Sequence, residues 1–175
     1  LAYAGAEGIA SQNTGRVYEK ALLLCESLGY PEETFSVLSG LCSFYFLRSF
    51  FGKVQDNATL SIKLASNTRN SNGLVNGNRI LGAVQFVTAH FDVSIKSLGS
   101  AINIYDENPA FHQRNTLAYA LDHKTSALCY LSLANLSIGK LDSSLRNSNY
   151  SISHSKSVNL HSVNYALCYQ ASLFF

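Results

Sequence analysis

The sequence of 175 residues contains no methionine and no tryptophan, has only two prolines, and is poor in charge. Charged residues make up 14% of the chain, against about 25% in a typical globular domain, and 24 serines and 15 asparagines take their place. The net charge of +2 arises from interleaved signs, so no basic stripe predicts a nucleic-acid partner. Because 47% of the residues are apolar, an intrinsically disordered chain is excluded.

Long apolar runs are also absent. No stretch approaches the roughly 18 uninterrupted apolar residues of a membrane-spanning helix, so we predict no membrane partner. The first residues, LAYAGAEGIAS, lack the basic and apolar regions of a signal peptide, and we expect a cytoplasmic protein. Since the sequence does not begin with methionine, it is either a processed chain or a segment of a longer protein, and the second is favoured.

The four cysteines form no Cys-x-x-Cys pair. Cys25, Cys42, Cys129 and Cys168 are far apart, and each lies in an apolar stretch with a helical pattern. In such a stretch a free cysteine behaves as a small hydrophobic residue. A disulfide framework is the alternative, but it is typical of secreted chains with a small core. We therefore expect reduced thiols.

One pattern of small and large residues occurs three times along the chain. Each copy begins with leucine followed by a small residue, which is Cys42, Gly82 or Ser132, so the interval is 40 residues and then 50. A second small residue follows seven positions later, and a large apolar residue two positions after that. The second small residues are Ser49, Ala89 and Gly139, and the large ones are Phe51, Phe91 and Leu141.

This pattern predicts a helical hairpin. A small residue in the middle of one helix lets the partner helix approach closely, and Gly139 suits the left-handed conformation just past a helix end. Because one hairpin cannot bury its apolar face alone, such units stack into arrays. We predict a single all-α array over residues 1–175 with three to four hairpins. Its approximate units are 1–29 (partial), 32–68, 73–105, 122–157 and 160–175 (partial).

Apolar spacing predicts where the helices lie. Residues 17–28 and 35–47 have the density and the three-to-four-residue spacing of helices, whereas strand-like alternation is weak. Pro31 fits a first helical turn and Asp122 fits an N-cap. The segment 106–121 contains the extra residues of the longer interval and has room for a short helix. The expected helices are 14–29, 32–48, 50–68, 73–88, 91–105, 122–138, 141–157 and 160–175.

The series of positions resembles the tetratricopeptide repeat, a pair of antiparallel helices of about 34 residues. The chain departs from that repeat in its longer intervals and in lacking the closing proline at Ser66, Asp106 and Lys156. The layout is similar, more narrowly, to helical-repeat regions of large bacterial signalling ATPases, often fused to a cyclase or a DNA-binding domain. The residues that carry this similarity are Tyr18-Glu19-Lys20-Ala21, Leu28-Gly29, 35–41 (FSVLSGL), Phe44-Tyr45, Ala101-Ile102, Tyr105-Asp106, His112 and Asp122.

The resemblance implies a right-handed α-α superhelix of about seven to eight helices and a non-catalytic scaffold. It also implies protein–protein or intramolecular regulatory contacts, with a nucleotide-hydrolysing domain N-terminal to this segment. The phosphate-binding pattern G-x-x-x-x-G-K-S/T is absent from the sequence itself.

In stacked hairpins of this kind the first helix of each pair lines the concave side. Counting from the three small residues predicts twelve groove positions, with one cation, Arg79, which is too few for a clamp on a peptide C-terminus. We expect a short apolar or amphipathic helix in the groove, or a neighbouring domain of the same polypeptide. The positions are Ser36, Ser39, Ser43, Phe46, Asn76, Arg79, Ala83, Phe86, Ser126, Cys129, Leu133 and Leu136.

A second class of function is a helical ligand- or metal-binding bundle, or an enzyme fragment. His154, His161 and Cys168 are seven residues apart, so a continuous helix would align them as three metal ligands. A turn expected near Ser157 breaks that line, and no zinc-type spacing occurs. We therefore predict no metal and no cofactor.

The acid–imidazole pair Asp122-His123 lies near Cys129, which could suggest a cysteine nucleophile. Adjacent residues on a helix do not face each other, and the surroundings of Cys129 are small and apolar. We therefore predict no catalytic residue.

The last expected helix ends in Ala-Ser-Leu-Phe-Phe without a polar cap, and we expect self-association through it.

Overall fold

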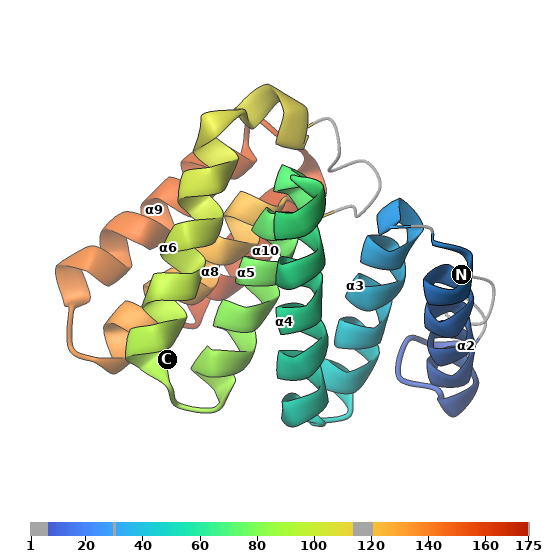
Figure 1. The fold of residues 1–175 in the computed structure, drawn as a ribbon. Helices are drawn as coiled ribbons and strands as arrows, with labels where there is room; N and C mark the ends of the chain where they lie inside the picture. The colour runs from blue at the N-terminus through green and yellow to red at the C-terminus, as the bar shows by residue number, and fades with distance from the viewer. Residues whose placement is uncertain (1–6, 30, 114–120, 175) are drawn as a thin grey trace. The chain divides into compact units, whose positions relative to one another are not determined.

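The computed structural model describes residues 7–29, 31–113 and 121–174, and the regular structure in these ranges is entirely helical (Figure 1). The prediction of an all-α fold is confirmed for these ranges. The helices are α2 (Gln12–Leu28), α3 (Pro31–Leu47), α4 (Phe51–Thr68), α5 (Ser71–Val87), α6 (Phe91–Glu107), α8 (His123–Ser137), α9 (Leu141–Ser155) and α10 (Leu160–Ala171).

Each expected helix is present, with ends within a few residues of the prediction. α3 begins at Pro31, and residues 109–113 form part of the short helix expected in the segment 106–121. The predictions for residues 1–6, 114–120 and 175 lie outside the described residues. None of the helices within the described ranges combines the length and apolar content that a bilayer crossing needs.

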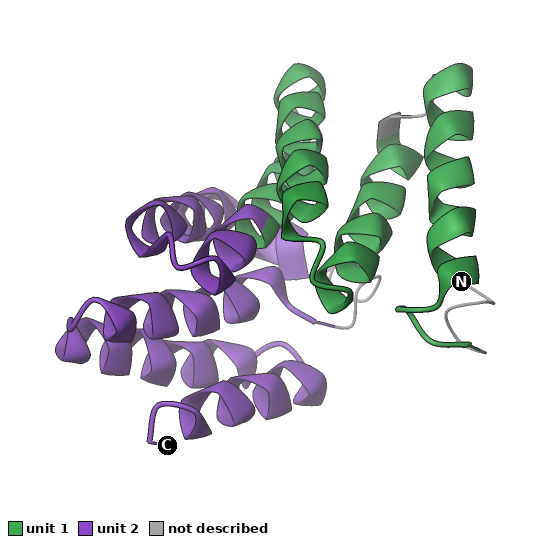
Figure 2. Ribbon diagram, turned by 90° about the horizontal axis from the view of Figure 1, so that it is seen from below, with its two compact units in different colours: residues 1–80 green, residues 81–175 purple. Residues whose placement is uncertain are grey.

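The chain divides into two compact units (Figure 2). Unit 1 covers residues 1–80 and unit 2 covers residues 81–175, so the boundary falls inside α5. Unit 1 contains α2, α3, α4 and the first part of α5. Unit 2 contains the rest of α5 together with α6, α8, α9 and α10.

The turns of the three hairpins have the same geometry. Ser49, Ala89 and Gly139, the second small residues of the pattern, have φ values of 60°, 62° and 77°. In each turn the next residue's N–H donates back to a carbonyl five residues earlier, which closes the first helix. These bonds are Phe50 N to Tyr45 O (2.9 Å), His90 N to Gln85 O (2.8 Å) and Lys140 N to Asn135 O (2.8 Å). The predicted position of the turn is confirmed in all three copies.

The first small residue of each copy is the place where the two helices of a hairpin meet. The Cys42 thiol donates to the Val54 carbonyl with an Sγ–O distance of 3.8 Å. The Ser94 hydroxyl donates to the Gly82 carbonyl at 2.8 Å. The Ser132 hydroxyl donates to the carbonyl of Ser144, also at 2.8 Å. All three contacts join residues twelve positions apart, so the repeat predicted from the sequence is also a repeat of contacts.

Close approach in unit 1 uses further glycines. A Cβ on Gly15 of α2 would lie 2.3 Å from the Phe44 ring of α3, and one on Gly40 of α3 would lie 2.3 Å from the Tyr18 ring. A Cβ on Gly77 would lie 2.7 Å from the Ile62 side chain, so α4 and α5 also approach each other closely. Large side chains of one helix thus fill gaps above glycines of the next.

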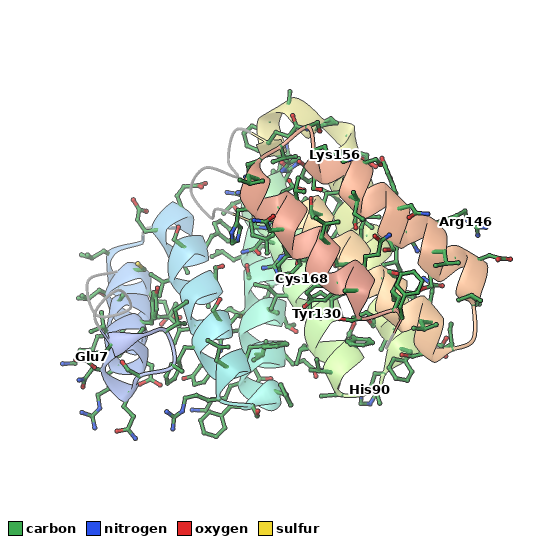
Figure 3. The ribbon with its side chains drawn as sticks, turned by 180° about the vertical axis from the view of Figure 1, so that it is seen from behind. Glu7, His90, Tyr130, Arg146, Lys156 and Cys168 are labelled. Carbon is green, nitrogen blue, oxygen red and sulfur yellow. The ribbon has the colours of Figure 1, made fainter. Side chains whose placement is uncertain are left out.

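In unit 2 the core lies between α6 and α8. Leu98, Ala101 and Ala127 are buried together, and Tyr130 packs against them. The Tyr130 ring, labelled in Figure 3, also lies 5.9 Å from the Phe86 ring and 5.3 Å from the ring of Tyr169 on α10. An aromatic contact therefore connects α5, α8 and α10 within this unit.

The glycine at the second hairpin contact gives a direct test of close packing. A Cβ on Gly82 would lie 2.5 Å from Leu98 Cγ and 3.2 Å from the Leu98 nitrogen, so Gly82→Ala forces α5 and α6 apart. Overpacking costs about 1–3 kcal/mol, which exceeds the gain of up to about 1 kcal/mol in helix propensity. We expect a lower free energy of unfolding in urea.

Gly99 of α6 is the matched control, because a Cβ added to it would meet nothing within 4 Å. Gly99→Ala should stabilise the chain by about 0.5–1 kcal/mol. Equal effects of the two substitutions would contradict the close approach at Gly82.

Candidate functional site

The predicted groove residues of α3 form an accessible face of unit 1. Ser36 and Ser43 are exposed, while Ser39 and Phe46 are half-buried. Their spacing places them on one side of the helix. The Ser43 hydroxyl donates to the Ser39 carbonyl at 3.0 Å, a bond within the helix. This face is mainly hydroxyl and offers polar contacts with one aromatic ring at its end.

The groove residues of α5 are divided between the two units. In unit 1, Asn76 is buried and its side-chain oxygen accepts from Arg79 Nη2 at 2.7 Å. In unit 2, Ala83 is buried, and the half-buried Phe86 ring lies 5.8 Å from the Phe91 ring of α6. Arg79, the single cation of the predicted set, is thus held by its neighbour on the same helix.

The groove residues of α8 are more enclosed. Ser126 and Cys129 are buried, with 0% and 2% of their surface exposed, and Leu133 and Leu136 are half-buried. Burial raises the pKa of the Cys129 thiol to about 12, although a hydrogen bond with Ser151 of α9 opposes it. Cys129 is therefore a protonated thiol packed against α9 at neutral pH, as the packing interpretation of this residue expects.

The three residues of the alternative function do not come together. His154 lies at the Asp122 carboxylate, while His161 and Cys168 are both exposed on α10 (Cys168 is labelled in Figure 3). Within the described residues no group of three or more His, Cys, Asp or Glu side chains could hold a metal ion. The four cysteines are free thiols.

Asp122 is the centre of a buried polar cluster in unit 2. Its side chain accepts from the Thr125 N–H at 2.7 Å and so caps α8, as the sequence predicts. The same carboxylate accepts from the Tyr105 hydroxyl of α6 at 2.6 Å, and it lies 2.9 Å from His154 Nε2 of α9. The Asp122 backbone N–H donates to the Ser162 hydroxyl of α10 at 3.1 Å. One residue therefore joins four helices.

A second group of charges lies beside this cluster. Lys124, whose side chain is 4% exposed, places its ammonium 2.5 Å from the Asp106 carboxylate and 2.8 Å from the Tyr150 hydroxyl. The ammonium also lies 4.7 Å from the centre of the Tyr150 ring. Burial lowers the pKa of Lys124, but its hydrogen bonds with Asp106 and Tyr150 outweigh this and hold it raised. Lys124 thus remains charged and adds a second tie between α6, α8 and α9.

The electrostatics of the Asp122 cluster favour an ionised carboxylate. Burial by itself raises the pKa of Asp122, but hydrogen bonds from His154, Tyr105 and Thr125 outweigh it and hold that pKa well below 3.8. Burial and the bond to Asp122 raise the pKa of Tyr105, so its hydroxyl stays a donor. Burial lowers the pKa of His112, although the negative charges of Asp122 and Glu107 oppose this shift. The His112 ring stacks on the Tyr105 ring, with 5.0 Å between the ring centres.

A carboxylate that orients an imidazole can also serve general-base catalysis. Here the Asp122 side chain is fully shielded from solvent, and its two oxygens accept from donors on three helices. Such a residue can orient His154 and close the packing of α6, α8 and α9. The geometry of Asp122 is that of a structural residue that holds these three helices together.

Sequence reasoning identified Asp122 as a cap but missed its partners. The signal was present, because Tyr105 occupies the repeat position that Ala65 and Ser155 hold in the other copies. All three side chains are buried, so a tyrosine there needs a partner for its hydroxyl. The residues that carry the family resemblance already included Tyr105, His112 and Asp122, without a role for them.

Comparisons of the chain with protein-family models, with curated proteins and with solved structures find no match. Its function is therefore inferred from its own geometry.

The cluster predicts a specific pH dependence of stability. Asp122→Asn removes the charge that His154 and Tyr105 face, and breaking a buried pair costs about 3–5 kcal/mol. Because the folded-state pKa of Asp122 lies below its ordinary value of 3.8, the carboxylate stabilises the fold above that pH. The difference between parent and variant should shrink as the pH falls below 3.8 towards the folded-state pKa.

Urea titrations across acidic pH measure this difference. Asp56→Asn on the exposed face of α4 is the matched control and should unfold as the parent does. A difference that stays constant as the pH falls would contradict an ionised Asp122 in the folded state.

Proposed function

We propose that the chain is a non-catalytic helical-repeat scaffold for protein–protein contacts, stacked as a right-handed superhelix like that of tetratricopeptide repeats. The observation that carries this proposal is the repetition of one hairpin in three copies. Each copy has the same left-handed turn and a hydrogen bond between residues twelve positions apart. Hairpins that repeat one after another are typical of arrays whose shared surfaces bind other proteins.

The distribution of reactive side chains supports a non-catalytic role. Asp122 is shielded and bonded within its own unit, and the thiols of Cys42 and Cys129 are buried with their pKa raised to about 12 by that burial. Protonated, enclosed thiols and an enclosed carboxylate are packing elements rather than nucleophiles. The histidine and cysteine residues of the alternative function are not assembled into a site, so no observation favours that alternative.

The surroundings of this scaffold are proposed from its resemblance to repeat regions of bacterial signalling ATPases. In that setting the partner is another protein, a peptide, or another domain of the same polypeptide, such as an ATPase or cyclase, in the cytoplasm. The hydroxyl-rich face of α3, with Ser36 and Ser43 exposed, supports a contact surface because it can donate and accept hydrogen bonds without a charge cost.

The contact function is tested by selecting amphipathic helical peptides from a phage library on the whole 175-residue chain. Substitution of Ser36 and Ser43 by Arg adds two long charged side chains to the α3 face. It should lower the affinity of the selected peptides for the chain at least about tenfold. Thr59→Arg on the exposed face of α4 is the control and should bind as the parent does. Fluorescence anisotropy gives the affinities.

Two results of that selection would contradict the proposal. One is a library from which no peptide is enriched. The other is a set of peptides that bind the α3 variant as tightly as the parent.

Self-association is a second part of the proposal, and a specific observation favours it. Leu160 and Leu167 of α10 lie seven residues apart and are 74% and 47% exposed, and Phe174, which follows the end of the helix, is 69% exposed. Such spacing aligns side chains along one face of a helix. An exposed apolar stripe of this kind is typical of an interface, and a second copy of the chain can cover it.

Sedimentation velocity over a range of concentrations tests this contact. The parent should form dimers or larger species, and Leu160→Lys with Leu167→Lys should be monomeric at the same concentrations, because a lysine ammonium is costly to bury. Leu60→Lys on α4, where the parent side chain is 41% exposed, should associate as the parent does. A parent that is monomeric throughout would rule the contact out.

A further inference from the structure

Unit 1 contains a basic pocket that no predicted groove residue lines. An open cavity of about 270 Å³ lies where α2 begins and where α3 turns into α4. Three cations, Arg16, Arg48 and Lys53, line it together with one carboxylate, Glu19. In a chain with few charges, three cations at one cavity are a local concentration of positive charge.

Aromatic rings hold two of these cations at the wall of the pocket. The Arg48 guanidinium lies 5.7 Å from the ring centres of both Phe44 and Phe50. The Lys53 ammonium lies 4.8 Å from the centre of the Tyr45 ring. Contacts between a cation and a ring face restrain the head group without neutralising it. Arg48 Nη1 also donates to the Ala10 carbonyl at 3.1 Å, which leaves most guanidinium N–H groups for a ligand.

The acidic group in the pocket is already engaged. Glu19 accepts from the Tyr45 hydroxyl at 2.7 Å. Burial, that hydrogen bond and the Glu19 charge raise the pKa of Tyr45 to about 12, so the hydroxyl keeps its proton and remains a donor to Glu19. Arg16 and Lys53 form no hydrogen bond or ion pair with an acidic side chain in the described part of the chain. The pocket therefore has an excess of positive charge.

Backbone dipoles add to this excess. Gln12, the first residue of α2, lines the pocket, and the N-terminus of a helix carries partial positive charge. The opposing dipole of α3 is reduced because its last carbonyls are bonded: Ser49 N donates to Phe46 O at 3.0 Å and Phe50 N to Tyr45 O at 2.9 Å. Anionic ligands are favoured at such a place.

We propose that this pocket binds an acidic peptide segment of a protein partner. Arg16, Arg48 and Lys53 hold an Asp or Glu carboxylate of that segment, and a neighbouring apolar side chain packs on Phe50, which is 49% exposed. The proposal rests on the proposed contact function but concerns a surface apart from the Ser36 and Ser43 face. It names the class of ligand for that function, which is a partner protein with an acidic, partly apolar segment.

The pocket fits a peptide better than a single-stranded nucleic acid. Phe44 and Tyr45 are buried, so Phe50 is the one exposed ring in the lining of the pocket, whereas proteins that bind single strands stack successive bases on several rings. A peptide segment with carboxylates beside one apolar side chain matches three cations beside one exposed ring.

Fluorescence anisotropy with the whole chain tests the proposal. The probe is a fluorescein-labelled peptide containing Asp-Glu-Phe-Asp-Glu, and its matched counterpart contains Asn-Gln-Phe-Asn-Gln. We expect the acidic peptide to bind and its affinity to fall with added salt, because the contacts are solvent-accessible. The amide peptide should bind at least about tenfold more weakly, as expected when charge-assisted hydrogen bonds are lost.

Variants then locate the site. Arg16→Gln and Lys53→Gln should each lower the affinity for the acidic peptide about tenfold. Lys63→Gln on the exposed face of α4 should leave that affinity unchanged. Thermal unfolding by circular dichroism shows that each variant is folded. Absence of binding, equal affinity for the amide peptide, or unchanged affinity of both pocket variants would overturn the proposal.

These outcomes are separable from those of the phage selection. Library peptides that depend on the α3 face, together with pocket variants that behave as the parent does, would refute the acidic-peptide site and leave the scaffold function standing.

Discussion

The structure depends on one steric constraint, the close contact of two antiparallel helices at a small residue. Cys42, Gly82 and Ser132 each occupy that place, and in each case a polar bond crosses to the backbone or side chain twelve residues later. A larger side chain at these positions would separate the helices and expose the backbone groups that now pair across them. Because the constraint recurs, the same hairpin forms three times along the chain.

Unit 2 adds a polar tie to this steric one. The stretch between its first and second hairpins is ten residues longer than the equivalent stretch in unit 1, and Asp122 closes it by joining α6, α8, α9 and α10. A buried carboxylate is stable only when its oxygens are bonded, so the cluster also fixes how the helices of this unit align. Unit 1 has no described equivalent at this position, where Ala65 stands in place of Tyr105.

The helices, the turns and the hairpin contacts were predictable because they depend on residues close in the chain. Ser49 and Ala89 adopt the left-handed conformation expected for Gly139 although neither residue favours it, and in each turn the next N–H bonds to a carbonyl five residues earlier. The N-cap role of Asp122 was equally local. Its bonds to His154 and Ser162, in contrast, join residues 32 and 40 positions apart, and no local pattern indicates them. The pocket at Arg16, Arg48 and Lys53 was missed for the same reason, because three helices contribute to it.

Nuclear Overhauser spectroscopy of the isotopically labelled chain tests the central claim, the equivalence of the three hairpin contacts, most directly. The account predicts inter-helix cross-peaks between residues 42 and 54, between 82 and 94, and between 132 and 144, all in one sample. Three pairs of cross-peaks would establish one hairpin repeated along the chain. If any of these residues instead shows contacts with a different helix position, the three copies are not equivalent and the repeat interpretation is wrong.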